Sequence, residues 1–358
     1  MLVRDVAAAL SARLVGEGSL QVDRVVHPAD AQGQSDLAVA LTAETFRALG
    51  SSKAVAAIVA QNAAPAPDHI KTLIVAGHER MALATLTALF DGGPARNAGI
   101  DPTAVVSADA VMGESVSIGP FVVIGPRVRI GARTVILSHA TIGADVTIGE
   151  QGLIYSGVRI GDRVTIGDRF IVHYNAVIGS DGFSFLPVPQ RKGGPAPAKA
   201  IPTRVHSLGN IVIGDDVEIG ACSTIARATL ETTRIGDGTK LDNHVHIGHN
   251  VTIGEACLIA GMVGISGSVV VGDRVMMGGG VGIADHISIG SDSMVAAASM
   301  VGSNVGDGAR VAGYPAMPHD RALETYMYLR RLRALYNRVK VLDDRIEALQ
   351  KSNKDGKS

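Results

Sequence analysis

The sequence contains no tryptophan, and phenylalanine and tyrosine make up only 3% of its 358 residues. Cysteine is almost as scarce, with Cys222 and Cys257 as the two examples. Two cysteines 35 positions apart do not indicate a disulfide framework or a metal site, and we interpret both as small packing residues. Because 46% of the residues are hydrophobic, the chain can form a large core, and that core must be aliphatic rather than aromatic.

A strong charge of either sign is also missing, since the formal net charge is −1. The composition therefore gives no sign of a nucleic-acid partner. No apolar run reaches the length of a membrane-spanning helix, and residues 1–18 lack the continuous apolar segment of a secretory signal. We expect a cytoplasmic protein with no membrane span.

What the sequence does contain is an aliphatic residue at every sixth position over two long runs. The first run steps from Ile118 to Ile178, and the second steps from Ile213 to Val295 with four extra residues between Ile225 and Ile235. A glycine follows most of these aliphatic residues. A six-residue period held this long is typical of a hexapeptide β-helix, and it fits neither the period of an α-helix nor simple strand alternation.

In such a fold, three hexads make one triangular coil of about 18 residues, with the aliphatic side chains inside the prism. The glycine that follows lies near a corner, where we expect it to tolerate an unusual backbone conformation. Residues 18 positions apart then lie one above the other, because successive coils stack at about the strand spacing of 4.8 Å. The predicted fold is mainly β, a left-handed parallel β-helix with a small N-terminal α/β domain and a C-terminal α-helix.

The N-terminal domain, residues 1–98, does not show the repeat. Its apolar pattern predicts an amphipathic helix that includes Val3, Val6, Leu10 and Leu14, buried strands at residues 55–60 and 72–76, and a helix at residues 79–90. We assign residues 99–314 to the β-helix domain.

The tail, residues 315–358, changes period again. Its apolar residues alternate spacings of three and four, which predicts a helix that packs on its own chain or on a partner subunit: Leu332, Leu335, Val339, Leu342, Ile346 and Leu349. The rest of this helix is rich in arginine and lysine. This basic surface would also suit an acidic protein partner.

Two insertions interrupt the repeat. Residues 180–210 are rich in glycine and proline and include the cationic residues Arg191, Lys192, Lys199 and Arg204. This segment is either a tolerated insertion or a flap beside a site, where its cations would suit an anionic ligand. The second insertion, within residues 226–234, must bulge from a corner about one coil before His249 and is expected to shape the same groove.

His249 is the candidate for chemistry. It lies two residues after the inward Ile247, so its side chain is expected near a corner, where it faces solvent or a groove. Gly267 lies 18 positions later and His286 lies 37 positions later, so all three should follow one edge of the prism. A neutral imidazole and a bare backbone N–H are the base and the oxyanion donor that acyl transfer needs. Asp242 is a candidate to orient the imidazole of His249.

Two alternatives to this interpretation remain open. The histidines can be surface residues without a role. They can also be metal ligands, because hexapeptide prisms can bind zinc through three histidines at subunit interfaces, as in γ-type carbonic anhydrases. His206 lies in the insertion and its offset from His244 is not a multiple of 18, so a metal site is not favoured.

Several motifs occur in order along the chain, and together they resemble one family. They are VIGSDGF at 177–183, IGDDVEIGACSTI at 213–225, Asp242-Asn243, IGHNV at 247–251, Ala260-Gly261, Ser266-Gly267-Ser268 and GYPAMP at 313–318. This order resembles the UDP-3-O-(3-hydroxyacyl)glucosamine N-acyltransferases of lipid A biosynthesis. The resemblance covers nearly the whole chain and is strongest in the β-helix.

The resemblance implies a reaction and roles for individual residues. A 3-hydroxyacyl group would move from the phosphopantetheine of acyl carrier protein to the 2-amino group of UDP-3-O-acylglucosamine, with no further cofactor and no metal. His249 matches the family's general base, the Gly267 amide matches the oxyanion donor, and Asp242 matches the acid near the base. The substrate-binding positions would be His286, Asn243, Phe46, Ser180, Asp181, Gly182, Phe183 and, near the acyl groove, Met300. The family is a homotrimer with its active sites between prisms.

The chain departs from the family at positions that concern the substrate. The family usually has Asp-Arg-Gly where this chain has Ala226-Arg227-Ala228, and Ala40 and Ala43 stand where larger or polar residues usually flank the uracil. Two alternatives follow from these differences. One is a related hexapeptide acyltransferase that acts on another nucleotide-linked amino sugar, and the other is an inactive trimeric scaffold.

Overall fold

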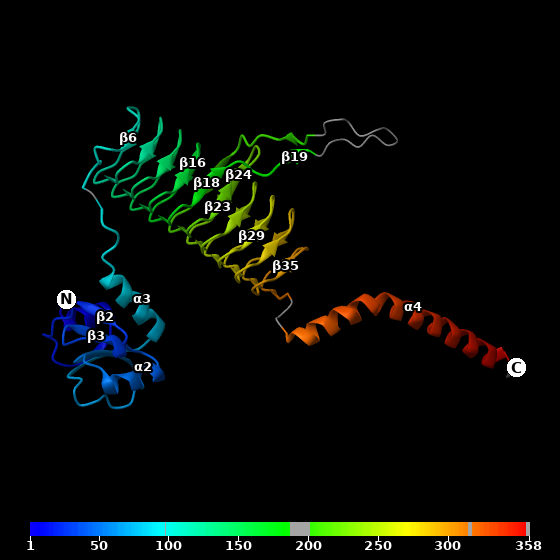
Figure 1. Cartoon of the computed structure of the whole chain (residues 1–358), viewed down its shortest axis with the longest axis horizontal. Helices are drawn as coiled ribbons and strands as arrows, with labels where there is room; N and C mark the ends of the chain where they lie inside the picture. Colours follow the sequence, from blue (N-terminus) through cyan, green and yellow to red (C-terminus); the bar gives the residue numbers. More distant parts are fainter. Residues whose placement is uncertain (97, 187–200, 314–316, 356–358) are drawn as a thin grey trace. The chain divides into compact units, whose positions relative to one another are not determined.

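The computed structural model describes residues 1–96, 98–186, 201–313 and 317–355 (Figure 1). The chain divides into two compact units, Met1–Ala95 and Arg96–Ser358, and each is described by itself. Among the described helices, none combines the length and the apolar character that crossing a membrane requires.

The first unit is an α/β domain around one five-stranded sheet in the order β1-β5-β4-β3-β2. Strand β1 is antiparallel to β5, and the other neighbours are parallel. Its elements are α1 (Val3–Ala9), β1 (Arg13–Gly16), β2 (Arg24–Val26), η1 (Pro28–Asp30), β3 (Asp36–Ala40), α2 (Ala43–Ala48), η2 (Leu49–Ser51), β4 (Ala56–Ala60), β5 (Thr72–Ala76) and α3 (Glu79–Phe90).

The predicted elements of this unit are confirmed at β4, β5 and α3. The N-terminal helix is shorter than predicted, because α1 ends at Ala9 and Leu14 lies in β1. The apolar residue Leu14 fits the helical spacing by chance, although it lies in a strand. Strands β1, β2 and β3 and helix α2 were not predicted, since short strands beside polar turns carry little periodic signal.

The second unit is a parallel β-helix whose three walls are β-sheets, most of their strands only two residues long. The first face has ten strands: β8 (Ser117–Ile118), β11 (Val135–Ile136), β14 (Leu153–Ile154), β17 (Ile171–Val172), β22 (Glu218–Ile219), β25 (Lys240–Leu241), β28 (Leu258–Ile259), β31 (Met276–Met277), β34 (Met294–Val295) and β36 (Arg310–Val311). The second face has ten strands: β6 (Val105–Val106), β9 (Val123–Ile124), β12 (Thr141–Ile142), β15 (Arg159–Ile160), β18 (Val177–Ser180), β23 (Thr224–Ala226), β26 (His246–Ile247), β29 (Gly264–Ile265), β32 (Gly282–Ile283) and β35 (Met300–Val301). The third face has nine strands: β7 (Val111–Met112), β10 (Arg129–Ile130), β13 (Thr147–Ile148), β16 (Val164–Ile166), β21 (Asn210–Ile213), β24 (Thr232–Ile235), β27 (Thr252–Ile253), β30 (Val270–Val271) and β33 (Ser288–Ile289).

The register confirms the predicted coil length. Ile130 pairs with Ile148, 18 positions on. The two insertions change this offset without breaking the stack. Ile166 pairs with Ile213 across the first insertion, and Ile213 pairs with Ile235 across the second. Within the first insertion, β19 (Phe185–Leu186) and β20 (Thr203–Arg204) form an antiparallel hairpin. Arg191, Lys192 and Lys199 lie outside the described residues.

The interior of the β-helix is an aliphatic column, as predicted. Ile118, Ile136 and Ile154 are fully buried, and one continuous cluster of buried side chains runs along the coils. Phe170 is the aromatic residue of this column, and it is 1% exposed. It fits because Gly152 has no side chain: a Cβ there would lie 2.0 Å from Cε1 of Phe170.

The expected reason for the corner glycines holds at Gly179, which follows Ile178 and has a φ of 100°, but it was wrong for the others. The positive φ angles fall on residues such as Arg127, Arg133 and Asn250, three positions after the inward residue. The glycines are required for close packing instead. A Cβ at Gly131 would lie 2.5 Å from the backbone carbon of Gly149 in the next coil, a distance that no side chain can occupy.

The two cysteines behave differently. Cys257 is buried in the column, and this burial raises the pKa of its thiol, so its interpretation as a packing residue is confirmed. Cys222 is exposed at a corner with a φ of 58°, so the same interpretation was wrong there. Both cysteines carry free thiols.

The C-terminal helix is α4 (His319–Asp355), and it has 37 residues. Its apolar stripe is unpartnered in a single chain, because Leu332, Leu335, Val339, Leu342 and Ile346 are all about half exposed. The helix therefore exposes an apolar stripe to solvent in the single chain.

Candidate active site

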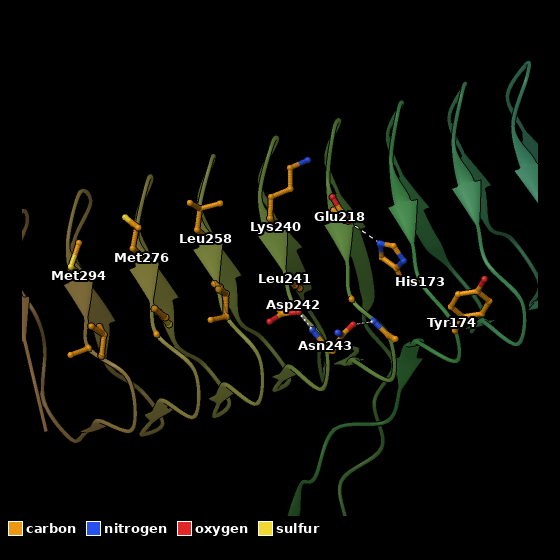
Figure 2. A pocket seen from close by; sticks show the side chains of 18 residues that line it. His173, Tyr174, Glu218, Lys240, Leu241, Asp242, Asn243, Leu258, Met276 and Met294 are labelled. Atoms are coloured by element: carbon orange, nitrogen blue, oxygen red, sulfur yellow. Dashed lines mark hydrogen bonds and ion pairs between the residues drawn. The ribbon is translucent and has the colours of Figure 1, made fainter. Parts of the chain in front are cut away.

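Two large hollows lie on different faces of the β-helix. The first, which we call the apolar groove, has a volume of about 950 Å³ and lies on the first face. Figure 2 shows Lys240, Leu258, Met276 and Met294 in a row on successive strands along this groove. The second, the histidine pocket, has a volume of about 760 Å³ and lies on the second face. The lining of the histidine pocket includes Phe183, His246, His249, Gly267, His286 and Met300.

His249 lies at the corner that follows β26, because the inward Ile247 fixes the register of this hexad. Its ring lies between two glycines. A Cβ at Gly267 would be 2.8 Å from Nε2 and Cε1 of His249, and a Cβ at Gly182 would be 2.7 Å from its Cβ. The half-buried imidazole is therefore held between the start of the first insertion and the next coil, and its Nε2 atom lies beside the Gly267 backbone.

The predicted line of His249, Gly267 and His286 is present. The carbonyl of His249 accepts the N–H of Ser268 at 2.9 Å, and the carbonyl of Gly267 accepts the N–H of His286 at 3.2 Å. Within the described parts of the chain, the Gly267 amide N–H donates to no protein acceptor. A backbone donor without a partner beside a histidine nitrogen is the arrangement that an oxyanion site requires.

Asp242 lies elsewhere within one chain. It follows β25 at the corner between the first and second faces, and it lines the apolar groove rather than the histidine pocket (Figure 2). Its carboxylate accepts the N–H of Asn243 at 2.7 Å. The Oδ1 atom of Asn243 in turn accepts the N–H of Ala221 at 2.7 Å, so this amide supports the corner of the coil below.

The polar end of the apolar groove carries a cluster that sequence analysis missed. His173 and Glu218 pair at 2.8 Å, and the His173 ring stacks on Tyr155 with ring centres 5.0 Å apart. Tyr174 lies beside them at the corner (Figure 2). Tyr155 lies 18 positions before His173, a spacing available in the sequence, whereas Glu218 lies 45 positions after His173, across the first insertion. Only the structure shows that His173, Tyr174 and Glu218 face a groove.

The start of the first insertion is anchored beside His249. The N–H of Gly182 donates to Oγ of Ser207 at 3.0 Å, and the carbonyl of Ser180 accepts the N–H of Arg227. Asp181 pairs with Arg204 at 3.4 Å and with Arg227 at 3.8 Å. Arg204 is therefore already paired, so its charge is less available to an anionic ligand than the sequence suggested.

Phe183 and Met300 are the most exposed apolar residues of the histidine pocket. Phe183 is 89% exposed and contacts Phe185, with ring centres 5.2 Å apart. Met300 is 84% exposed and lies over Gly282, where a Cβ would be 2.4 Å from its sulfur. These side chains are available to an apolar ligand.

Phe46 belongs to the first unit, where it packs at the edge of a cluster that includes Leu49.

Three residues near His249 were given no role by sequence analysis. The Nδ1 atom of His249 lies 3.0 Å from Oδ1 of Asn250, and Asn250 also contacts Thr229 and Glu231 of the second insertion. This confirms that the second insertion reaches the site. The four extra residues in the repeat indicated that an insertion lies near His249, but they did not show that Asn250 contacts its imidazole.

A hexapeptide β-helix with a histidine and a free backbone N–H in an open pocket defines a hexapeptide-repeat acyltransferase. Two family models match parts of the chain. Residues 232–267 match the bacterial transferase hexapeptide (six repeats) model, and residues 95–182 match the GMPPB C-terminal domain model. Among solved structures, the Arabidopsis UDP-N-acetylglucosamine acyltransferase is similar, with a TM-score of 0.54 and 26% identity over 60% of this chain and 71% of that chain. These results confirm the predicted left-handed β-helix.

The sequence comparisons define the family more narrowly. The UDP-3-O-acylglucosamine N-acyltransferase of Ruegeria pomeroyi is 46% identical over 270 residues, which cover 72% of this chain and 74% of the relative. The enzyme of the same name from Thermosynechococcus vestitus is 52% identical over 269 residues, which cover 75% of this chain and 77% of the relative. The chain belongs to the family of UDP-3-O-acylglucosamine N-acyltransferases, and its predicted class as an acyltransferase is confirmed.

Proposed function

We propose that this enzyme transfers a 3-hydroxyacyl group from acyl carrier protein to the 2-amino group of UDP-3-O-acylglucosamine in the cytoplasm, a step of lipid A biosynthesis. The observation that carries the proposal is that Nε2 of His249 lies beside Gly267, whose backbone N–H donates to no acceptor in the described parts of the chain. The names of the relatives supply the substrate class. The phosphopantetheine of the carrier protein holds the acyl group as a thioester, so the chemistry needs no other cofactor.

In the proposed reaction, the amine nitrogen attacks the thioester carbonyl while Nε2 of His249 removes a proton from it. The carbonyl oxygen becomes an oxyanion, and the Gly267 N–H donates a hydrogen bond to it. The carbon–sulfur bond then breaks, and the leaving thiolate takes up the proton from the imidazolium. His286 is proposed to place the substrate, and Met300 and Phe183 offer apolar contacts to an acyl chain.

The active site is proposed to lie between copies of the chain in a homotrimer. Asp242 and His249 line hollows on different faces, so Asp242 can approach the imidazole of His249 only if it comes from a second copy, where its charge would stabilise the imidazolium. The exposed apolar side chains of the first face support this arrangement, because water-exposed rows of leucine and methionine are typical of interfaces. The exposed stripe and the arginines of α4 suit a neighbouring subunit and an acidic carrier protein.

A second candidate is acyl transfer to another nucleotide-linked amino sugar. Ala226 lines the histidine pocket where the family usually has a carboxylate, so one polar contact to the substrate is lost. Assays with alternative amino sugars distinguish the two candidates. An inactive trimeric scaffold is the third possibility, and it requires that no amino sugar be acylated.

The first experiment compares acyl transfer by the wild type and by His249→Ala, with 3-hydroxyacyl carrier protein as donor and UDP-3-O-acylglucosamine as acceptor. We expect the activity of the variant to fall by about 10²- to 10⁴-fold, the usual contribution of a general base. His139→Ala is the matched control, because His139 also lies at a corner but outside both hollows. Equal activity of the wild type and His249→Ala, with both folded, would rule out the proposed base.

A further inference from the structure

The side-chain amide of Asn250 has a fixed orientation. The backbone N–H of Thr229 lies 3.1 Å from one end of this amide, and Oε2 of Glu231 lies 3.3 Å from the other end. A backbone N–H can only donate a hydrogen bond, and a carboxylate can only accept one. The end near Thr229 is therefore the oxygen and the end near Glu231 is the nitrogen, and the two contacts give this assignment independently.

This orientation determines the protonation of the neighbouring imidazole. The oxygen of Asn250 lies 3.0 Å from Nδ1 of His249, and an amide oxygen can only accept. Nδ1 must therefore carry the hydrogen. Because a neutral imidazole has a single N–H, the lone pair is on Nε2, the nitrogen beside Gly267.

The second insertion supplies both groups that orient Asn250. Thr229 and Glu231 belong to its extra residues, and the Thr229 carbonyl accepts the N–H of Leu208 at 2.7 Å, which fixes the second insertion to the end of the first. The backbone of Asn250 is held as well, because its N–H donates to Oγ1 of Thr233 at 3.0 Å. Its φ of 61° is a conformation that asparagine adopts more readily than most residues.

We propose that Asn250, oriented by Thr229 and Glu231, is a positioning residue that keeps His249 in the tautomer with hydrogen on Nδ1 and a free lone pair on Nε2. The inference rests on the proposed role of His249 as the base. It also explains why a regular repeat carries four extra residues at this coil. An asparagine can hold the tautomer without a negative charge, whereas a carboxylate at the same place would also stabilise the imidazolium and make the imidazole more basic.

The direct test is ¹⁵N NMR of the full-length protein labelled at histidine nitrogen, without substrate, with the His249 signals assigned by their loss in His249→Gln. We expect the neutral wild-type ring to carry its proton on Nδ1. In Asn250→Ala, we expect the Nε2–H tautomer, which predominates in free histidine, to become the major form. A wild-type ring with its proton on Nε2 would overturn the inference, and so would an Nδ1–H tautomer that persists in Asn250→Ala.

Acyl-transfer kinetics give the second readout. We expect kcat/KM of Asn250→Ala to fall by about 10- to 100-fold. This loss does not exceed the one expected when the general base itself is removed, because Asn250 acts only through His249. Asn250→Asp combined with Glu231→Gln should restore most of this loss and move the acidic limb of the pH–rate profile to higher pH. Asn175→Ala is the matched control, since Asn175 also has a positive φ but lies at another corner. Equal kinetics of Asn250→Ala and Asn175→Ala would contradict the proposal.

The two readouts separate this inference from the proposed function. If wild-type protein shows the Nδ1–H tautomer but acylates no amino sugar, the positioning of His249 stands and the assigned reaction fails. If the reaction proceeds and depends on His249 while the tautomer is Nε2–H, the reaction stands and the role of Asn250 fails. Glu231→Ala provides a further variant should Asn250→Ala not fold, and it is expected to increase the population of the Nε2–H tautomer.

Discussion

The apolar groove and the histidine pocket lie on adjacent faces of the same β-helix, and they differ in the side chains that dominate their linings. The groove has exposed leucine and methionine side chains and the carboxylate of Asp242. The pocket has three histidines and the free N–H of Gly267. This difference supports the proposal that one chain carries two complementary parts of a site that a second copy completes.

The third face makes the comparison clearer. Its outward positions include Arg129, Thr147 and Arg234, which are exposed and polar. All three faces have the same inward aliphatic column, so the fold does not require the outward difference. We infer that the apolar first face contacts another chain and that the third face contacts solvent.

The largest expected effect comes from charging the groove. Leu258→Asp combined with Met276→Asp places two carboxylates on the first face, where both side chains are exposed in a single chain. If this face is an interface, the double variant should dissociate to monomers and lose nearly all activity, although every residue of the histidine pocket is unchanged. Size-exclusion chromatography with light scattering and the acyl-transfer assay measure the two effects.

Val270→Asp is the matched control for this experiment. Val270 is 53% exposed on the third face and Leu258 is 48% exposed on the first, so the two side chains start from similar environments. The control should remain assembled and active. An assembled, active double variant would mean that the groove is not part of an interface.

An intermediate effect is expected from Gly267→Ala in the pocket. The new methyl group would lie 2.8 Å from Nε2 of His249, so the ring must move away from the reacting amine. We expect kcat to fall by about 10- to 100-fold with assembly unchanged, because misplacing a catalytic group by about 1 Å can cost about 10²-fold. Gly306→Ala is the control, since a Cβ there meets nothing within 4 Å. Equal kcat values for the two variants would show that the ring position is not critical.

The smallest effect is expected from single substitutions of exposed methionines, one in each hollow: Met300 of the pocket and Met294 of the groove. Met300→Ala removes a side chain that is 84% exposed, and we expect it to change the ratio of kcat/KM between two acyl chain lengths several-fold. Met294→Ala should change this ratio less if the pocket holds the transferred chain. A larger change in Met294→Ala would assign the chain to the groove instead.

The sequence predicted those features that follow from a strict period. The inward column, the 18-residue coil and the alignment of His249 with Gly267 and His286 all depend on backbone geometry that repeats. Asn250 was missed because its role depends on the path of an irregular insertion. The period also gives no information about which outward face is apolar enough to form a groove. The short strands of the first unit were missed because local pattern is weak where long-range pairing decides the structure.

The measurement that tests the central claim most directly is complementation between two inactive chains. His249→Ala and Asp242→Ala, carried on differently tagged chains, are co-expressed, and mixed trimers are purified through both tags. If each site takes its imidazole from one copy and its carboxylate from the next, one site in three of every mixed trimer has both groups intact. The account predicts about one third of wild-type activity. Mixed trimers no more active than the two separate variants would contradict it.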